Sequence, residues 1–375
     1  MIHYFDYNAT NPTRPEVVEA VVRALAADVG NPSSMHAAGR RARALLDEAR
    51  ARVATLVGAD PRFVVFTSGA TEANNLAVRG FAAVHPQGTV ITTAIDHVSI
   101  LAPVESLARE GYRVEVLGVG VGARPDMSHI RELSERGPCL VATSWANGES
   151  GHVADVEALV GAVAPGSLLH LDAAQATGRI PVRVAGGVSM LSMSAHKFGG
   201  PRGVGALVVK DPTHIEPLLR GGPQENGLRP GTENLAGIVG FGVAARSAGA
   251  SLASEAARLS ALREDLWEKL MRALPKILRI TPPEGLPNTL TVALPGIGGD
   301  VLTAALDLRG FAVSTGAACA AGAPEPSHVV RGLGVASEYR GGVVRVSMGL
   351  GTTSDAVEAL ASAFADVVAS AREAA

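Results

Sequence analysis

Polar side chains of the kinds that carry chemistry follow three strands predicted within this 375-residue chain. A turn of small residues at 68–72 follows the run 63–67 and opens a helix, so it presents backbone N–H groups that suit a phosphate. Asp172 ends the run 168–172, and Lys197 follows the run 189–194. Ligands of open α/β sheets bind beyond the carboxyl ends of the strands, so we predict that these groups share one site.

Pyridoxal phosphate is the cofactor that would use all three groups. A carboxylate beside its ring nitrogen keeps that nitrogen protonated, which makes the ring an electron sink for a carbanion. A lysine in a shielded neighbourhood has a lowered pKa and reacts with the aldehyde. Taken singly, each feature is also typical of ordinary structure: a capped turn, a strand-end salt bridge, or a structural histidine such as His196.

The lysine has few competitors, because only four of the 33 basic residues are lysines. Lys210 directly follows a predicted buried strand, Lys269 lies on a predicted helix, and Lys276 adjoins a proline. Only Lys197 follows a strand end that is rich in polar groups. We therefore predict that Lys197 is the residue that binds the cofactor.

The elements that must position these groups are short β-rich runs separated by amphipathic helices. This alternation predicts an α/β fold with a mainly parallel, seven-stranded sheet covered by helices on both faces. The predicted strands are 63–67, 89–93, 113–119, 139–144, 168–172, 189–194 and 205–209, and the helices between the earlier strands are 42–57, 72–84, 99–109 and 154–163.

The pattern changes from about residue 235 and predicts a second, smaller α+β domain. A long helix over 235–270, interrupted around Gly249, precedes strands and helices that alternate to the C-terminus. Thr353 or Ser354 is expected to cap the last helix. We assign residues 15–250 to the large α/β domain and residues 1–14 and 251–375 to the small domain. The later strands are 289–294 and 343–347, and the later helices are 301–308 and 355–371.

Composition and charge exclude several classes of protein. With 47% hydrophobic and 18% charged residues, the chain is not mainly disordered. A net charge of −3 gives no reason to expect binding to nucleic acid or a membrane surface. The most apolar window, 235–245, is shorter than the roughly 20 residues of a spanning helix. Two cysteines form no disulfide framework and no signal peptide is visible, so we expect a cytoplasmic protein.

Ten motifs in a fixed order extend along nearly the whole chain. They are DYNATNP from Asp6, GNPSSMHAAG from Gly30, FTSGATEANN from Phe66, DHVS from Asp96, HLDAAQATG from His170, SAHKFGGPRGVGAL from Ser194, GGPQENGLRPGTEN from Gly221, STGAACAAG from Ser314, EPSHVVRGLG from Glu325 and VRVSMGLGTT from Val344. No single motif is specific. In this order, the set resembles the cysteine desulfurases of the class V aminotransferase family, in the subgroup that supplies sulfur for iron–sulfur clusters and nitrogenase.

The resemblance implies a homodimeric fold type I enzyme with pyridoxal 5′-phosphate at the subunit interface. Lys197 would bind the cofactor covalently and move the Cα proton, and His97 would stack on the ring and assist proton transfer. Asp172 would pair with the ring nitrogen, and Arg345 would bind the substrate carboxylate through its planar guanidinium. The remaining cofactor contacts would come from Gln175 to the ring hydroxyl, and from Ala70, Thr71, Ser194, His196 and the other subunit's Thr232 to the phosphate.

Cys319 would carry the sulfur. It lies in a Gly/Ala-rich stretch that suits a mobile loop, on which a thiolate takes sulfur from L-cysteine as a persulfide, releases L-alanine and serves an acceptor protein. His97 is one candidate for deprotonating it. We interpret Cys139, inside a predicted strand, as a small buried hydrophobe. The pathway served by the sulfur stays open: iron–sulfur clusters, thio-cofactors or tRNA thiolation.

The chain departs from the family pattern at Gly148, where the family has an asparagine that contacts the cofactor ring. We expect that contact to be lost unless water or Asn147 replaces it. Serines usual around the catalytic cysteine are partly alanine here, at Ala317, Ala318 and Ala320. The usual Arg-Phe after the last Leu-Gly is Leu350-Gly351.

Other functions use part of the same residues. A selenocysteine lyase or another Cβ–S lyase would need the same pyridoxal core, whereas an aminotransferase has no use for a cysteine on a mobile loop. A non-catalytic assembly scaffold is opposed by the retained Lys197 and Cys319. Zinc and nucleotide sites are not indicated, because ligand spacing and a Walker-type motif are absent from the sequence.

Overall fold

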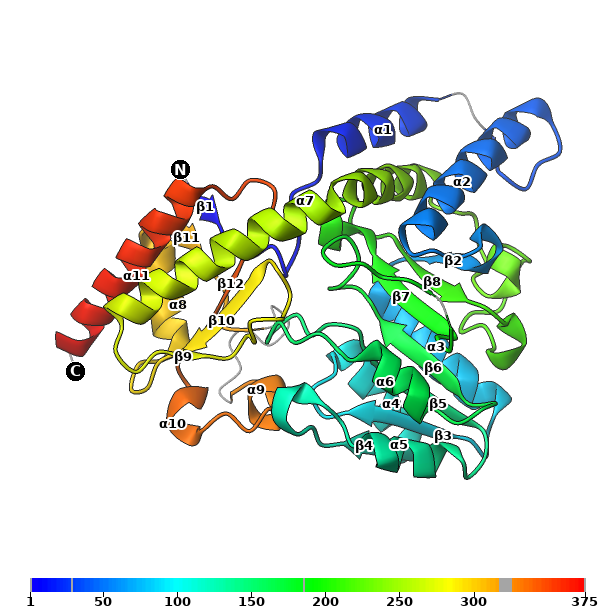
Figure 1. Ribbon diagram of the computed structural model, residues 1–375. Helices are drawn as coiled ribbons and strands as arrows, with labels where there is room; N and C mark the ends of the chain where they lie inside the picture. The colour runs from blue at the N-terminus through cyan, green and yellow to red at the C-terminus, as the bar shows by residue number, and fades with distance from the viewer. Residues whose placement is uncertain (1, 28–29, 185, 317–325, 374–375) are drawn as a thin grey trace.

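A seven-stranded sheet forms the centre of the large domain in the computed structural model, which describes residues 2–27, 30–184, 186–316 and 326–373 (Figure 1). The strand order is β2-β8-β7-β6-β5-β3-β4, and only β8 runs antiparallel to its neighbours. The predicted mainly parallel, seven-stranded sheet is therefore confirmed. The strands are β2 (Val64–Thr67), β3 (Thr89–Thr93), β4 (Arg113–Leu117), β5 (Cys139–Ser144), β6 (Leu168–Asp172), β7 (Met190–Ser194) and β8 (Gly205–Val209).

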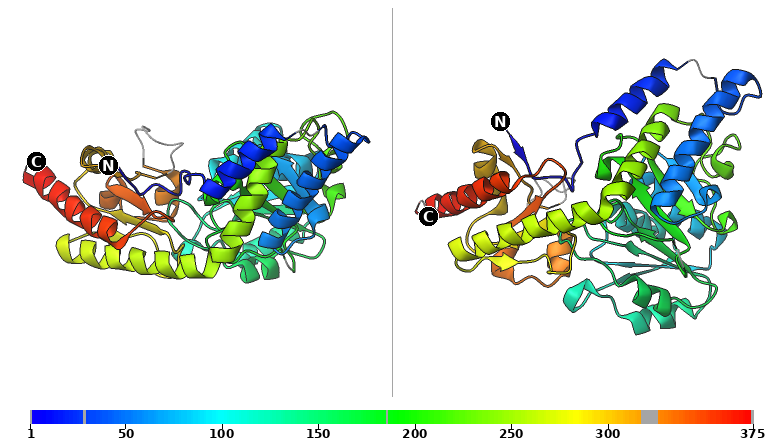
Figure 2. Two further views of the ribbon diagram at one scale, coloured as in Figure 1. Left: turned by 90° about the horizontal axis from the view of Figure 1, so that it is seen from above. Right: turned by 45° about the horizontal axis from the view of Figure 1, so that its top comes forward.

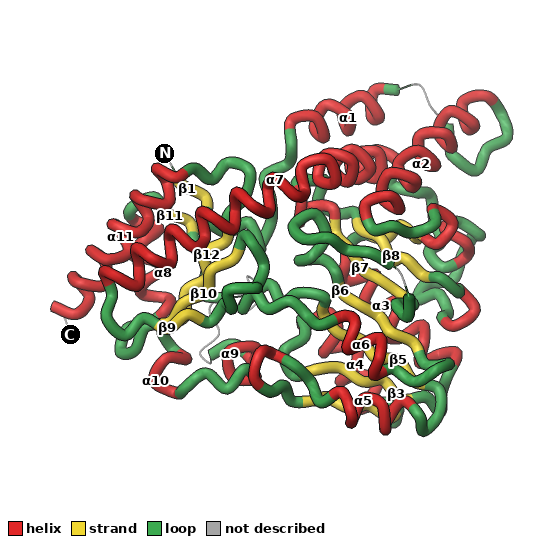
Figure 3. The backbone as a smooth tube through the Cα atoms, in the orientation of Figure 1, coloured by secondary structure: helices red, strands yellow, loops and turns green. Residues whose placement is uncertain are grey.

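Both faces of this sheet are buried, because successive side chains of a strand point to opposite faces. Val64 and Phe66 of β2 belong to one hydrophobic core, and Val65 between them belongs to another. The helices form the outer layers on both sides (Figure 3). The first core contains residues of α1 (Pro15–Ala26), α2 (Ala37–Leu56), α5 (Met127–Ser134), α6 (Val156–Ala162) and α7 (Leu235–Ala273), and the second contains residues of α3 (Ala70–Val84) and α4 (Val98–Arg109).

α7 is one continuous helix of 39 residues, so the interruption predicted around Gly249 is wrong. A glycine inside a helix costs about 1 kcal/mol relative to alanine, and packing outweighs this cost here. The helix packs against α1 and α2 in the large domain and against α11 (Ser354–Glu373) in the small one. It crosses the predicted domain boundary at residue 250 and runs along both domains (Figure 2).

By length and composition alone, α7 is long and apolar enough to cross a membrane. The apolar window 235–245 of the sequence was too short to suggest this. Half of its most apolar stretch is buried inside the fold. A core helix of a globular domain passes the same test, so this feature is weak evidence for a membrane span.

The small domain joins segments from both ends of the chain. β1 (His3–Tyr4) pairs in parallel with β11 (Phe311–Ala312), and β12 (Val343–Ser347), β10 (Thr289–Ala293) and β9 (Leu278–Arg279) form an antiparallel sheet in that order. Thr353 caps α11, because Ala356 N donates to its Oγ1 at 3.2 Å. The remaining helices are α8 (Gly299–Leu308), α9 (His328–Gly332) and α10 (Ser337–Arg340).

Candidate active site

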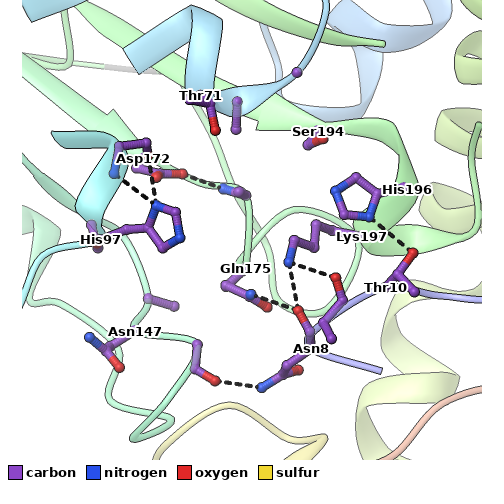
Figure 4. A pocket seen from close by; sticks show the side chains of 18 of the residues that line it. Asn8, Thr10, Thr71, His97, Asn147, Asp172, Gln175, Ser194, His196 and Lys197 are labelled. Atoms are coloured by element: carbon purple, nitrogen blue, oxygen red, sulfur yellow. Dashed lines mark hydrogen bonds between the residues drawn. The ribbon is translucent and has the colours of Figure 1, made fainter. Parts of the chain in front are cut away.

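A cavity of about 560 Å³ lies at the carboxyl ends of the parallel strands, where the two domains and the N-terminal segment meet (Figure 4). Strand ends of β5, β6 and β7 line it together with the first turn of α3. The structure therefore brings together most of the side chains predicted from the sequence. These are Ala70, Thr71, His97, Asp172, Gln175, Ser194, His196, Lys197 and Arg345.

Lys197 lies on a single 3-10 turn, Ala195–Phe198, that directly follows β7. Its Nζ donates to the carbonyl oxygens of Asn8 at 2.6 Å and Ala9 at 3.0 Å. Burial, together with the positive charges of Arg179 and Arg345, lowers the pKa of Lys197 to about 8. The lowered pKa increases the fraction of neutral amine, which is the form that attacks an aldehyde.

Asp172, at the end of β6, is held by two donors. Ala174 N donates to Oδ1 at 2.9 Å, and Asn74 Nδ2 donates to Oδ2 at 2.7 Å. Because a carboxylate only accepts, the amide of Asn74 must turn its nitrogen to Asp172 and its oxygen to His170 Nε2, 3.0 Å away. His170 is fully buried, and burial lowers its pKa to about 3, so the ring is neutral.

The same amide reaches His97 through Ser99. Asn74 Nδ2 donates to Ser99 Oγ at 2.8 Å, and that hydroxyl lies 2.7 Å from His97 Nδ1. Ser99 N also donates to Nδ1 at 3.1 Å, so Nδ1 is an acceptor and the proton of the neutral ring is on Nε2. Burial lowers the pKa of His97. A neutral, fixed ring next to Asp172 suits stacking on a flat cofactor.

The phosphate end is built from the turn between β2 and α3. The first N–H groups of α3 have no intrahelical partner, so they are available to an anion. Gly205 allows β8 to approach this turn, because a Cβ there would lie 2.6 Å from Gly69 Cα. His196 Nδ1 lies 3.1 Å from Thr10 Oγ1 on the same side of the cavity. Burial lowers the pKa of His196 to about 4, so its ring is neutral.

Arg345 lies on β12 and lines the same cavity. Its Nη2 is 2.6 Å from Asp6 Oδ1, and Nη1 donates to Gly148 O at 3.1 Å. Its Nε is buried and has no partner among the residues that the structure describes. The planar guanidinium of an arginine that lines the cavity can bind a carboxylate through two N–H groups.

The donor set as a whole fits pyridoxal phosphate with an amino acid. Lys197 offers the amine, Asp172 offers an oriented carboxylate for a ring nitrogen, and the start of α3 offers N–H groups for the phosphate. Arg345 Nε has no partner within the described part of the chain, and a buried unsatisfied donor is costly, which favours an anionic ligand such as a carboxylate.

Comparisons with known proteins agree with this geometry. The profile of the family Aminotransferase class-V matches residues 3–360. The chain belongs to the class V aminotransferase family.

Relatives within this family cover almost the whole chain. The cysteine desulfurase IscS of Dictyoglomus turgidum is 38% identical, with 94% of this chain and 91% of the relative covered. A solved NifS-like protein is 33% identical, with a TM-score of 0.92, and covers 98% of this chain and 100% of its own. The structure of SspA in complex with cysteine is 31% identical, with a TM-score of 0.80, covering 92% of this chain and 98% of its own.

One predicted site residue that the structure describes lies away from the cavity of this class V family member. Thr232 is exposed and does not line the cavity of its own chain. It is not the cap of α7 either, because Asn234 Oδ1 accepts from Gly237 N at 3.2 Å and takes that position. Cys319 lies outside the described residues. Cys139 is buried on β5, and burial raises the pKa of its thiol to about 12.

Several residues of the site were missed in the sequence. Asn8 supplies the carbonyl that holds Lys197, and Asp6 pairs with Arg345. Neither carries a periodic signal, because both lie in an irregular segment. Asn74 had a readable signal, since it is a polar residue in the same buried face as Val78 in an otherwise apolar helix pattern.

Proposed function

We propose that this protein is a pyridoxal-phosphate-dependent cysteine desulfurase that converts L-cysteine to L-alanine and transfers the sulfur to an acceptor protein in the cytoplasm. The observation that carries the proposal is one cavity lined by a low-pKa lysine, an oriented aspartate and an arginine. The names of the relatives and the cysteine bound to SspA support the substrate.

We assign each residue a part in this reaction. Lys197 would bind the cofactor and take the Cα proton on Nζ, Asp172 would hold the proton of the ring nitrogen, and Arg345 would orient the substrate carboxylate. His97 would stack on the ring and exclude water from that face. When bound, pyridoxal phosphate supplies an electron sink for charge that develops at Cα.

Sulfur leaves the substrate by attack of the Cys319 thiolate on the substrate Sγ. An S–S bond forms, the Sγ–Cβ bond breaks, and its electron pair stays with the carbon, which takes a proton and becomes the methyl group of alanine. The persulfide on Cys319 then passes its outer sulfur to the thiol of an acceptor protein. The transfer conserves electrons, so it needs no external oxidant or reductant.

A homodimer with shared active sites completes the proposal. Thr232 is exposed in the single chain, which suits a residue that contacts the phosphate of the other subunit. The helix α1 exposes Val18, Val22 and Leu25, at 48%, 57% and 73%, along one side. An apolar stripe at this spacing is typical of a face that another chain covers, and we assign a second copy to it.

Replacement of Cys319 tests the sulfur chemistry. Cys319→Ser is expected to bind the cofactor and L-cysteine but to lose alanine and sulfide production by orders of magnitude, because the nucleophile is removed. Cys139→Ser is the matched control and should keep its activity, since the Cys139 thiol is buried and protonated. Normal turnover by Cys319→Ser would instead favour a simple Cβ–S lyase or a selenocysteine lyase. Amino-acid product assays with L-cysteine and with L-selenocysteine distinguish these two activities.

A mixed dimer tests the shared site. Thr232→Ala should retain the cofactor about ten- to hundredfold less well, because a charge-assisted hydrogen bond is worth roughly 1.5–3 kcal/mol. In a dimer of one Lys197→Ala chain and one Thr232→Ala chain, the lysine-bearing site receives an intact Thr232 from its partner. That site should bind the cofactor as the wild type does. Binding as weak as in the Thr232→Ala homodimer would refute the shared site.

A further inference from the structure

Gly148 leaves a space that the side chain of Gln175 fills. A Cβ at Gly148 would lie 2.6 Å from Gln175 Nε2 and 2.7 Å from its Cδ, so any larger residue would displace this amide. Asn147 does not take over the missing contact. Its Nδ2 donates to Ile95 O at 2.8 Å, and its Oδ1 accepts from Ser150 N at 2.9 Å, so both ends of the amide are occupied away from the ligand.

Arg179 determines which way the Gln175 amide points. Its Nη1 donates to the backbone oxygen of Gln175 at 2.8 Å and also to the side-chain oxygen Oε1. With Oε1 accepting, Nε2 takes the other side and donates to Asn8 O at 3.1 Å. Lys197 Nζ donates to the same oxygen at 2.6 Å, so the glutamine N–H groups lie beside the reactive amine.

A purely structural role explains Arg179 poorly. The residue is 7% exposed, and among the described residues its guanidinium donates to uncharged oxygens, those of Gln175 and the backbone oxygen of Tyr7. Burial and the charge of Arg345 lower its pKa to about 9. A buried cation without a carboxylate partner costs stability, so an apolar side chain would serve the fold at least as well.

We propose that Arg179 is a positioning residue that holds Gln175 in the space left by Gly148, with Nε2 beside Lys197, and so compensates for the asparagine that the family has at this position. The inference rests on the proposed function, because it assigns these contacts to bound pyridoxal phosphate. In that cofactor the aldehyde and the ring hydroxyl are on adjacent carbons. A donor beside the amine that takes the aldehyde is therefore placed for the hydroxyl oxygen.

The cofactor's own titration provides the readout. A hydrogen bond to the deprotonated hydroxyl favours that form, so losing the donor raises the pH midpoint at which the visible absorption of the bound cofactor changes. Arg179→Lys keeps the charge but not the planar fork that holds two oxygens of Gln175. We expect its midpoint to rise by about one pH unit. Gln175→Ala should give the same rise, and the double variant no further rise, because the two residues act as a unit.

Two more variants separate the positioning of the Gln175 amide from effects on folding and on charge. Gly148→Ala leaves Arg179 in place but pushes the Gln175 amide aside, so its midpoint should also rise. Arg263→Lys is a control at another buried arginine, which donates to the backbone carbonyls of Gly285 and Leu286 and also pairs with Glu264. It should lower thermal stability without moving the midpoint. The other charged groups facing Lys197 stay unchanged in every variant: Arg345, Asp172 and Asp6.

The outcomes are distinct. Wild-type midpoints in both Arg179→Lys and Gly148→Ala would overturn the inference, as would shifts that add fully in the double variant. If Arg179→Lys does not fold, Arg179→Gln tests the same position, and its midpoint should rise as in Gln175→Ala and Gly148→Ala. A wild-type protein that binds no pyridoxal phosphate would refute the proposed function itself, whatever the variants do.

Discussion

The two ends of the central sheet each carry a lysine, and the comparison shows what makes one of them reactive. At the carboxyl end, Lys197 donates to the carbonyls of Asn8 and Ala9. At the amino end, a groove of about 370 Å³ contains Lys210, which donates to Gly186 O at 3.0 Å. Both lysines are partly buried, and both amines donate to backbone oxygens. These features alone do not distinguish the two lysines.

The difference lies in the charges that the fold brings to each end. Burial is the cause that lowers the pKa of Lys210, whereas Lys197 also faces the cations Arg179 and Arg345. The carboxyl ends of parallel strands lead into loops that converge on one place, and the small domain closes over them with β12. Apart from Lys210, Asp211 and His214, the amino-end groove is lined by small and apolar residues, and no arginine is among its lining residues in the described part of the chain. An enzyme site thus needs convergent charged groups as well as a lysine in a groove.

The largest expected difference between the two ends of the sheet is in cofactor attachment and turnover after each lysine is replaced. Lys197→Ala should abolish the covalent, borohydride-reducible bond to the cofactor and all turnover, because no other lysine reaches the cavity among the described residues. Lys210→Ala should keep both. Mass spectrometry of the reduced proteins locates the modified peptide. A reducible adduct that persists in Lys197→Ala would show that the reactive amine is elsewhere.

A smaller effect is expected from the amide that supports Asp172. Asn74→Ala removes a donor from a buried carboxylate, a bond worth roughly 1.5–3 kcal/mol, so cofactor affinity should fall about ten- to hundredfold. The amino-end control is Ser189→Ala, which removes an acceptor for Leu169 N and should leave cofactor affinity unchanged. Fluorescence titration of both apoproteins measures the constants, and equal affinities would mean that Asn74 does not support the site.

The smallest expected effect is on the pH dependence of cofactor capture by Lys197. Only the neutral amine attacks an aldehyde, and the pKa of Lys197 is lowered to about 8. The rate at which apoprotein captures pyridoxal phosphate should therefore rise with pH to a midpoint near 8 and level off above it. Stopped-flow absorbance at several pH values follows this rate. A midpoint close to the ordinary lysine value of about 10.4 would show that the surrounding charges do not act as the geometry indicates.

The architecture of the large domain and the reactive groups at its strand ends can be predicted from the amino-acid sequence. Alternating strands and helices predict a parallel sheet, and parallel strands place their carboxyl ends at one edge, so Asp172 and Lys197 were predicted to meet. Local periodicity was misleading at Gly249, where the contacts of α7 with both domains outweigh a weak helix-breaking tendency.

The groups that hold Lys197 and Asp172 in place can be identified only in the folded chain. Lys197 rests on a carbonyl that lies 189 residues away, and Asp172 depends on an amide 98 residues away. Backbone acceptors carry no signature in the side-chain pattern, and pairs at such separations leave no periodic trace. The fit of Gln175 over Gly148 is likewise a matter of distances between atoms, which emerge only when the chain is folded.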